Sequence, residues 1–346
     1  MTTLMFAEAA EAGAAVERML TANQRRIEEL GRELASSPPS AIVVCARGSS
    51  DHAGVYGKYL FETLCGTPVA AAALSVASVY GAAPRMARDR SILCIAISQS
   101  GRSPDLLASA RAWQDRGARL VAFVNDETSP LAGMADVFIP LSAGPERSVA
   151  ATKSFIVALA AEAALAAAWS GNQDISAALI KLPDQLRAAH EIDWSNALPV
   201  LNRDQSLFVL GRGYGLSVAR EAALKLKETC SLHAEAFSSA EVRHGPMAIV
   251  KKGFPILAFA GSDASGADVL NAAASFAARG AAVAVISPRG TTVGPDIINL
   301  SCECAHPTVE PVLQIQSFYR LVEQLARLRG LDPDNPAFLS KVTQTI

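Results

Sequence analysis

The sequence has little charge of either sign, few aromatic residues and no long unbroken apolar run. It holds 31 Lys and Arg against 33 Asp and Glu, a net charge of −2, so no basic excess or like-charge block favours a nucleic-acid or polyelectrolyte partner. The most apolar run, 155–169, is interrupted by Glu162, is too short for a membrane span and predicts a buried helix. Because half of the residues are nonetheless hydrophobic, we expect a soluble globular protein.

Cysteine is also scarce, and no export signal is visible. Residues 1–34 contain Glu and Arg throughout, so we expect a cytoplasmic protein whose six cysteines are reduced thiols. Cys45 and Cys94 lie in apolar runs that predict core strands. Cys302 and Cys304 form a C-x-C with no second pair nearby, and the other candidate ligands are scattered, so we expect no metal and no cofactor.

An internal repeat divides the chain, whose 346 residues suffice for two domains. The stretch from Val43 resembles the stretch from Leu207, and each ends in Arg-Gly. The match continues through the pairs LFETLC and LKETCS, ILCIAISQSG and PILAFAGSDASG, and RGARLVAFV and RGAAVAVIS. The offsets stay within 163 to 166 residues, which chance similarity of alanine-rich segments would not produce. The sequence therefore contains one design twice.

Within each copy, short apolar runs alternate with longer helical patterns, which is typical of a parallel sheet covered by helices. The expected strands are 41–46, 68–73, 92–97, 119–124 and 137–140 in the first copy and 206–210, 255–260, 281–286 and 297–300 in the second. We therefore expect an α/β protein with two tandem doubly wound parallel sheets. The expected segments are an N-terminal helix at 1–37, a first domain at 38–185, a second at 200–330 and a C-terminal tail at 331–346, with 183–205 joining the two halves.

A turn rich in serine, ISQSGRSPD, follows the third expected strand, at the edge where doubly wound sheets bind ligands. We call residues 98–103 the serine turn; its polar residues include Ser98, Gln99, Ser100 and Ser103. Ser-Pro-Asp at 103–105 predicts a helix start, whose amides can receive a phosphate without any cation. The alternative is an ordinary strand-to-helix turn with a good cap.

The repeat supplies an internal control for this choice. At the same place the second copy reads GSDASG, where Asp263 would repel a phosphate and the triple-serine spacing is lost. If serine served only for capping, both copies could have kept it, so the first copy is predicted to bind an anion. Ser49 and Ser50, after the first strand, are expected at the same edge of the sheet.

Five motifs in one order resemble those of the sugar isomerase (SIS) double-domain family. They are CARGSS, SQSGRSPD, AATKSF, ALKLKETCSLHAEAFSSAEVRHGP and DNPAFLSKVT. The resemblance runs from about residue 40 to the end of the chain. It is nearest to the isomerase half of glutamine–fructose-6-phosphate aminotransferase and to the stand-alone glucosamine-6-phosphate deaminases of the SIS type.

The resemblance implies that the serine turn holds a sugar phosphate, with Ser49 and Ser50 near the sugar and the phosphate. It implies that Glu228 moves a proton between C1 and C2, beside Lys225, and that Lys341 engages the carbonyl carbon. His244 would open and close the sugar ring, reaching across from the partner subunit of a homodimer. These residue types suit proton shuttling, ring opening and carbonyl chemistry. Without the resemblance, the same residues would be a surface pair, a loop histidine and a tail lysine.

The chain departs from the aminotransferase pattern in several places. It starts MTTLMF and enters a helix at once, so we expect no amidohydrolase domain that would release ammonia from glutamine. Arg102, Ser103, Ala151 and Arg243 replace an acidic residue, a threonine, a sugar-contacting serine and a lysine, respectively. We therefore expect an isomerising deaminase that converts glucosamine 6-phosphate to fructose 6-phosphate and ammonia. The alternatives are an aldose–ketose isomerase or ammonia-dependent synthase on a related sugar 6-phosphate, and a non-catalytic phosphosugar sensor.

Overall fold

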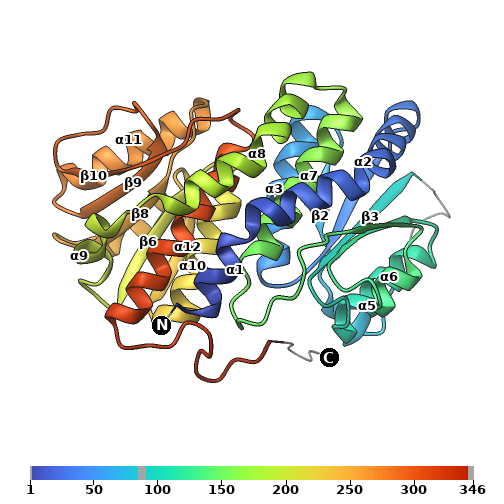
Figure 1. Cartoon of the computed structure of the whole chain (residues 1–346), viewed down its shortest axis with the longest axis horizontal. Helices are drawn as coiled ribbons and strands as arrows, with labels where there is room; N and C mark the ends of the chain where they lie inside the picture. Colours follow the sequence, from blue (N-terminus) through green and yellow to red (C-terminus); the bar gives the residue numbers. More distant parts are fainter. Residues whose placement is uncertain (1, 85–90, 342–346) are drawn as a thin grey trace. The chain divides into compact units, whose positions relative to one another are not determined.

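The computed structural model describes residues 2–84 and 91–341, which fall into two compact units (Figure 1). Of the described residues, unit 1 holds 2–13, 147–152 and 181–339, and unit 2 holds 14–84, 91–146, 153–180, 340 and 341. Each unit is built on a five-stranded sheet in which every strand pair is parallel. The predicted α/β class is therefore confirmed.

The sheet of unit 2 has the strand order β2-β1-β3-β4-β5. Its strands are β1 (Ala41–Cys45), β2 (Val69–Ala71), β3 (Ile92–Ser98), β4 (Arg119–Val124) and β5 (Val137–Pro140). Its helices are α2 (Ala12–Ser36), α3 (Ser49–Leu64), α4 (Ser75–Ser78), α5 (Pro104–Gln114), α6 (Pro130–Met134) and α7 (Lys153–Ser170). Every residue of β3 is buried, which is why this strand is continuously apolar in the sequence. The order reverses between β1 and β3, and ligands bind at such a switch point.

The sheet of unit 1 repeats this topology, with the order β10-β9-β8-β6-β7. Its strands are β6 (Ser206–Gly211), β7 (His233–Ser238), β8 (Pro255–Phe259), β9 (Ala282–Pro288) and β10 (Ile297–Cys302). Its helices are α1 (Leu4–Ala10), α9 (Leu198–Leu201), α10 (Gly215–Cys230), α11 (Ala264–Ala278) and α12 (Glu310–Leu328), with short 3-10 turns η1 (Ser195–Ala197), η2 (Glu241–Arg243) and η3 (Pro246–Ile249). As in unit 2, the first strand of the unit along the chain, β6, lies between the second, β7, and the third, β8, so the two copies share one topology.

One sequence expectation needs correction, and the structure adds a detail to another. The N-terminal segment is not one helix but two, α1 and α2, separated at Glu11, whose amide bonds the carbonyl of Glu8. The junction expected from residue 183 is helical at its start, because α8 (Gln173–Glu191) runs through Pro183. Proline disfavours a helix interior, but Leu182 and Leu186 on this helix are fully buried, and their burial outweighs the lost hydrogen bond.

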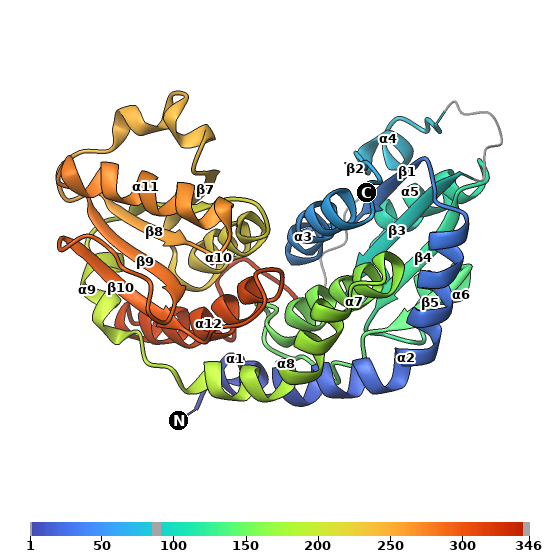
Figure 2. The same cartoon turned by 90° about the horizontal axis from the view of Figure 1, so that it is seen from above.

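The strand β7 is absent from the expected list because its sequence, HAEAFS, is not an apolar run. Its burial alternates at first and only Ala234 is fully buried, as for a strand at the edge of its sheet. The expected buried helix at 155–169 is confirmed as α7, which packs on α3 (Figure 2). By length and composition α7 could cross a membrane, but 83% of it is buried inside the protein, as in the core helix of a globular unit.

Candidate functional site

The serine turn connects β3 to α5 at the switch point of unit 2. Ser98 is the last residue of β3, and its hydroxyl accepts a hydrogen bond from the Gly101 amide at 2.9 Å. Gly101 has φ +62°, and a Cβ there would lie 2.3 Å from the Ser129 hydroxyl oxygen, so only glycine fits. The Gln99 carbonyl accepts from the Asp126 amide, which fixes the turn to the end of β4. The turn is therefore a rigid loop rather than a loose connection.

An ion pair joins α5, the helix after the serine turn, to the short loop that leads into α3, where Ser49 and Ser50 lie. These two serines are the first residues of α3, directly after Gly48 at φ +55°. The Arg47 guanidinium donates to one carboxylate oxygen of Asp105 at 2.6 and 2.8 Å, and Asp105 is fully buried in the first turn of α5. The structure thus brings the predicted phosphate-binding residues of unit 2 to the ends of the neighbouring strands β1 and β3.

The two copies differ at the start of the helix that follows the third strand. In unit 1, the Asp263 carboxylate caps α11 by accepting from the Gly266 amide at 3.0 Å. In unit 2, Ser103 is the N-cap of α5 and makes no side-chain hydrogen bond to the helix. The N-cap of α11 is therefore a carboxylate, whereas the N-cap of α5 is a neutral serine, and the acidic residue in the first turn of α5, Asp105, is paired with Arg47.

The guanidinium of Arg102 is not free to bind an anion at the serine turn, because it is already paired. It donates to Asp126 at 2.8 and 3.1 Å and to the Thr128 hydroxyl at 3.2 Å. Hydrogen bonds from Thr128, together with Arg102, hold the pKa of Asp126 below its usual range, so this carboxylate stays ionised. The predicted anion site would therefore rely on the neutral hydroxyls and amides of the turn.

Glu228 and Lys225 belong to a buried cluster on α10 of unit 1. The Lys225 ammonium lies 2.5 Å from Glu228 and 3.3 Å from Glu221, and the Lys225 and Glu221 side chains are at most 1% exposed. The Tyr319 hydroxyl lies 3.4 Å from Glu221. Glu228 is the accessible member, with 21% of its side chain exposed. A helix places residues at i, i+4 and i+7 on one face, which is why the three side chains meet.

The charges of this cluster keep Lys225 protonated. Burial alone would lower the pKa of Lys225, but the carboxylates of Glu221 and Glu228 outweigh burial and raise it. A protonated lysine with two carboxylate partners is a poor nucleophile, so Lys225 acts through Glu228: it holds that carboxylate in place beside a fixed positive charge. Glu228 is then the group that can exchange a proton with a ligand.

His244 follows η2 and is exposed. Its amide donates to the Glu241 carbonyl at 2.9 Å, while its imidazole makes no hydrogen bond or ion pair with any residue of 2–84 or 91–341. Gly245 beside it has φ +121°, which glycine tolerates and other residues do not. The imidazole is thus displayed on a defined turn.

Lys341, at the end of the described chain, belongs to unit 2. Its ammonium lies 3.3 Å from Glu146, a carboxylate that also accepts from the amide and hydroxyl of Ser154 at the start of α7. The tail is therefore anchored at Lys341. Lys341 and the serine turn lie in unit 2, and Lys225, Glu228 and His244 lie in unit 1.

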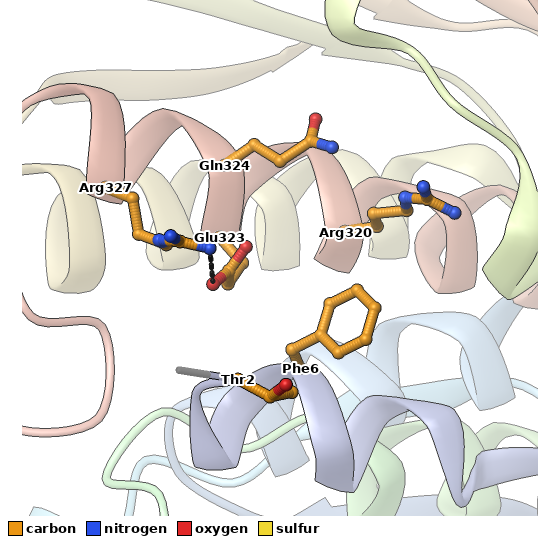
Figure 3. A pocket seen from close by; sticks show the side chains of 6 residues that line it. All are labelled: Thr2, Phe6, Arg320, Glu323, Gln324 and Arg327. Atoms are coloured by element: carbon orange, nitrogen blue, oxygen red, sulfur yellow. Dashed lines mark ion pairs between the residues drawn. The ribbon is translucent and has the colours of Figure 1, made fainter.

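A pocket of about 390 Å³ in unit 1 contains none of the predicted site residues (Figure 3). It is lined by Thr2, Phe6, Arg320, Glu323, Gln324 and Arg327. Its cations are already engaged: Arg327 lies 3.7 Å from Glu323, and Arg320 donates to the carbonyls of His190 and Glu191. Within the described ranges, no group of three His, Cys, Asp or Glu residues could hold a metal ion.

Sequence reasoning missed the acidic partners at these sites. Glu221 could have been found from its spacing to Lys225 and Glu228 on a predicted helix. Asp105 and Asp268 could have been found from the repeat, because both copies keep an aspartate that pairs with the arginine after the first strand.

A model of the SIS domain matches residues 36–168 and 200–293. The chain belongs to the SIS domain family. It is 34% identical to glutamine–fructose-6-phosphate aminotransferase (isomerizing) from Aeropyrum pernix over 87% of this chain and 50% of that protein. The Thermococcus kodakarensis enzyme of the same name is 30% identical, over 97% and 57%. The chain thus spans about half the length of the curated relatives it matches.

Solved structures share the two-domain SIS fold over their whole length. A Silicibacter pomeroyi protein assigned as a phosphosugar isomerase is 44% identical, with a TM-score of 0.89 over 96% of this chain and 100% of that one. The C-terminal domain of glucosamine-fructose-6-phosphate aminotransferase from Francisella tularensis is 25% identical, with a TM-score of 0.86 over 97% and 99%. A Thermotoga maritima glucosamine-6-phosphate deaminase, at 23% identity and a TM-score of 0.68, shares the fold.

Proposed function

We propose that this SIS protein is a phosphosugar isomerase that deaminates glucosamine 6-phosphate to fructose 6-phosphate and ammonia. The observation that carries the proposal is the buried cluster on α10, which leaves one carboxyl group, Glu228, accessible beside the ammonium of Lys225. A carboxylate so held suits the transfer of a carbon-bound proton. The serine turn supports the substrate class, because its neutral donors and its neutral N-cap, Ser103, suit a phosphate.

The proposed reaction has three steps. His244 moves a proton between the ring oxygen and the anomeric hydroxyl, which opens the sugar to its C1 aldehyde. Glu228 removes the C2 proton and returns it to C1, while one N–H proton of the C2 amine passes to the C1 oxygen, so that the aldehyde becomes a hydroxymethyl group and the amine becomes an imine. Water then adds to the imine, ammonia leaves, and the C2 ketone of fructose 6-phosphate remains.

The substitution Glu228→Gln tests this proposal. The amide keeps the shape of the side chain but cannot accept the C2 proton, so we expect turnover to fall by about 10²-fold or more while sugar-phosphate binding persists. Ammonia and fructose 6-phosphate are measured after incubation with glucosamine 6-phosphate. The matched control is Glu235→Gln, an exposed glutamate on β7, which should behave as the wild type.

The outcomes separate the candidate functions. Equal amounts of ammonia and fructose 6-phosphate support the deaminase, and full turnover by the Glu228→Gln variant removes that residue from its role. Binding without either product in the wild type overturns the deaminase and favours a phosphosugar sensor. A ketose product formed from an aldose 6-phosphate, without ammonia, favours the isomerase instead.

We also propose that the active form is a homodimer in which His244 serves the partner subunit. Its support is that the exposed imidazole makes no hydrogen bond or ion pair with the described part of its own chain. Glu228→Gln and His244→Ala would then be inactive alone. Mixed and allowed to exchange subunits, they should recover about a quarter of wild-type activity, because half of the dimers gain one intact site. No recovery despite demonstrated exchange would place His244 in its own subunit's site.

A further inference from the structure

One carboxylate on α11 holds both ends of the segment that presents His244. Asp268 accepts a short hydrogen bond from the Ser239 hydroxyl, where the segment begins after β7. It also lies 3.6 Å from the guanidinium of Arg243, the residue directly before His244. Arg212, after β6, adds a third contact at 2.7 Å. A single side chain thus links the switch-point loop, the start of the segment and its end.

Among the described residues, comparison of the two copies shows which of these contacts are additional. In unit 2 the equivalent aspartate, Asp105, pairs with Arg47, just as Asp268 pairs with Arg212. Holding the two switch-point loops together is therefore common to both copies. The contacts of Asp268 with Ser239 and Arg243 extend that arrangement to a segment that only unit 1 uses to display a histidine.

Within the segment 239–244, only the backbone fixes the direction of the His244 imidazole. Ser239 and Val242 are fully buried, and the Ser239 amide donates to the Gly211 carbonyl at 3.0 Å. His244 is exposed, and its ring has no partner among the described residues that could orient it. The direction of the ring therefore follows from how firmly the turn between Ser239 and Gly245 is held.

Asp268 remains charged while it holds this turn. The hydrogen bond from Ser239, with the guanidiniums of Arg212 and Arg243, holds the pKa of Asp268 below its usual range. The carboxylate balances two cations, and removing its charge would leave Arg212 and Arg243 repelling each other with nothing between them.

We propose that Asp268 is a positioning residue, which fixes the segment 239–244 and thereby aims His244 at the sugar ring. This inference rests on the proposed function for its kinetic consequence but not for its structural one. An acid–base group displaced by about 1 Å can lose about 10²-fold in rate. Loosening the turn should therefore lower kcat and leave KM nearly unchanged.

The test compares Asp268→Asn with Glu303→Gln, which breaks the exposed Arg289–Glu303 pair in the same unit. In Asp268→Asn, amide hydrogen exchange in 239–245 should rise at least tenfold, while exchange in the β8 and β9 strands and the thermal midpoint stay close to wild type. The control should show no such rise. This part holds whether or not the protein is a deaminase, and unchanged exchange overturns the proposal.

The kinetic part is a double-mutant cycle on glucosamine 6-phosphate. Asp268→Asn should lower kcat by about 10- to 100-fold with KM within about threefold, and Asp268→Glu should restore part of the loss. In a His244→Ala background, Asp268→Asn should cost less than about twofold, because both act through one group. Fully additive losses overturn the proposal, whereas a wild type that makes no product overturns the proposed function and leaves the exchange result to judge Asp268.

Discussion

At the scale of single residues, the buried carboxyl group of Glu162 on α7 destabilises the fold. Its side chain has no exposed surface, and neither carboxyl oxygen has a hydrogen-bond partner among the described residues. Gly57 of α3 makes room for it, since a Cβ there would lie 2.1 Å from one of the oxygens. Burial raises the pKa of Glu162 well above its usual range, so the group is held as a neutral acid.

This carboxyl should make stability fall with rising pH. Its folded pKa exceeds its unfolded one, so the folded state binds the proton more tightly, and that advantage is lost as the pH rises from about 4.5 toward the folded value. Replacement Glu162→Gln removes the titration. The free energy of unfolding is measured in urea at pH 5 and at pH 8. The difference, variant minus wild type, should be larger at pH 8 than at pH 5 by at least about 1.4 kcal/mol. The same difference in unfolding free energy at both pH values would show that Glu162 does not titrate in this range.

At the scale of elements, the sequence was informative where burial is complete. The expected strand at 119–124 is β4 to the residue, because a strand covered on both faces must be continuously apolar. The edge strand β7 was not predictable from that signal, since HAEAFS is largely half-exposed. The continuation of α8 through Pro183 was not predictable either, because local propensity argues against it and tertiary packing decides.

The predicted site residues follow the same division between local pattern and tertiary contact. Their elements were predictable: Ser98 ends a strand, Ser49 begins a helix, and Lys225 and Glu228 share a helix face. The ion pair of Arg47 with Asp105 joins elements far apart in the sequence, so only the repeat, which keeps the pair in both copies, could have indicated it. The motifs therefore indicate which residues matter, and the contacts show how they are held.

At the scale of the whole molecule, duplication followed by divergence accounts for the two units. Both keep one strand order and one arginine–aspartate pair at the switch point. They differ in the N-cap residue of the next helix: in unit 1 it is the carboxylate Asp263, which caps α11, and in unit 2 it is the neutral Ser103, which makes no capping bond. We propose that this difference reserves the serine turn of unit 2 for a phosphate.

That claim is tested most directly by calorimetric titration of glucosamine 6-phosphate into Glu228→Gln protein, which prevents turnover. In this background, Ser103→Asp should cap α5 as Asp263 caps α11 and should weaken binding by about tenfold or more, because a carboxylate would face the phosphate dianion. The matched change Asp263→Ser, in the other unit, should leave Kd within about twofold. Unchanged affinity in Ser103→Asp protein, or an equal loss from both changes, would contradict the account.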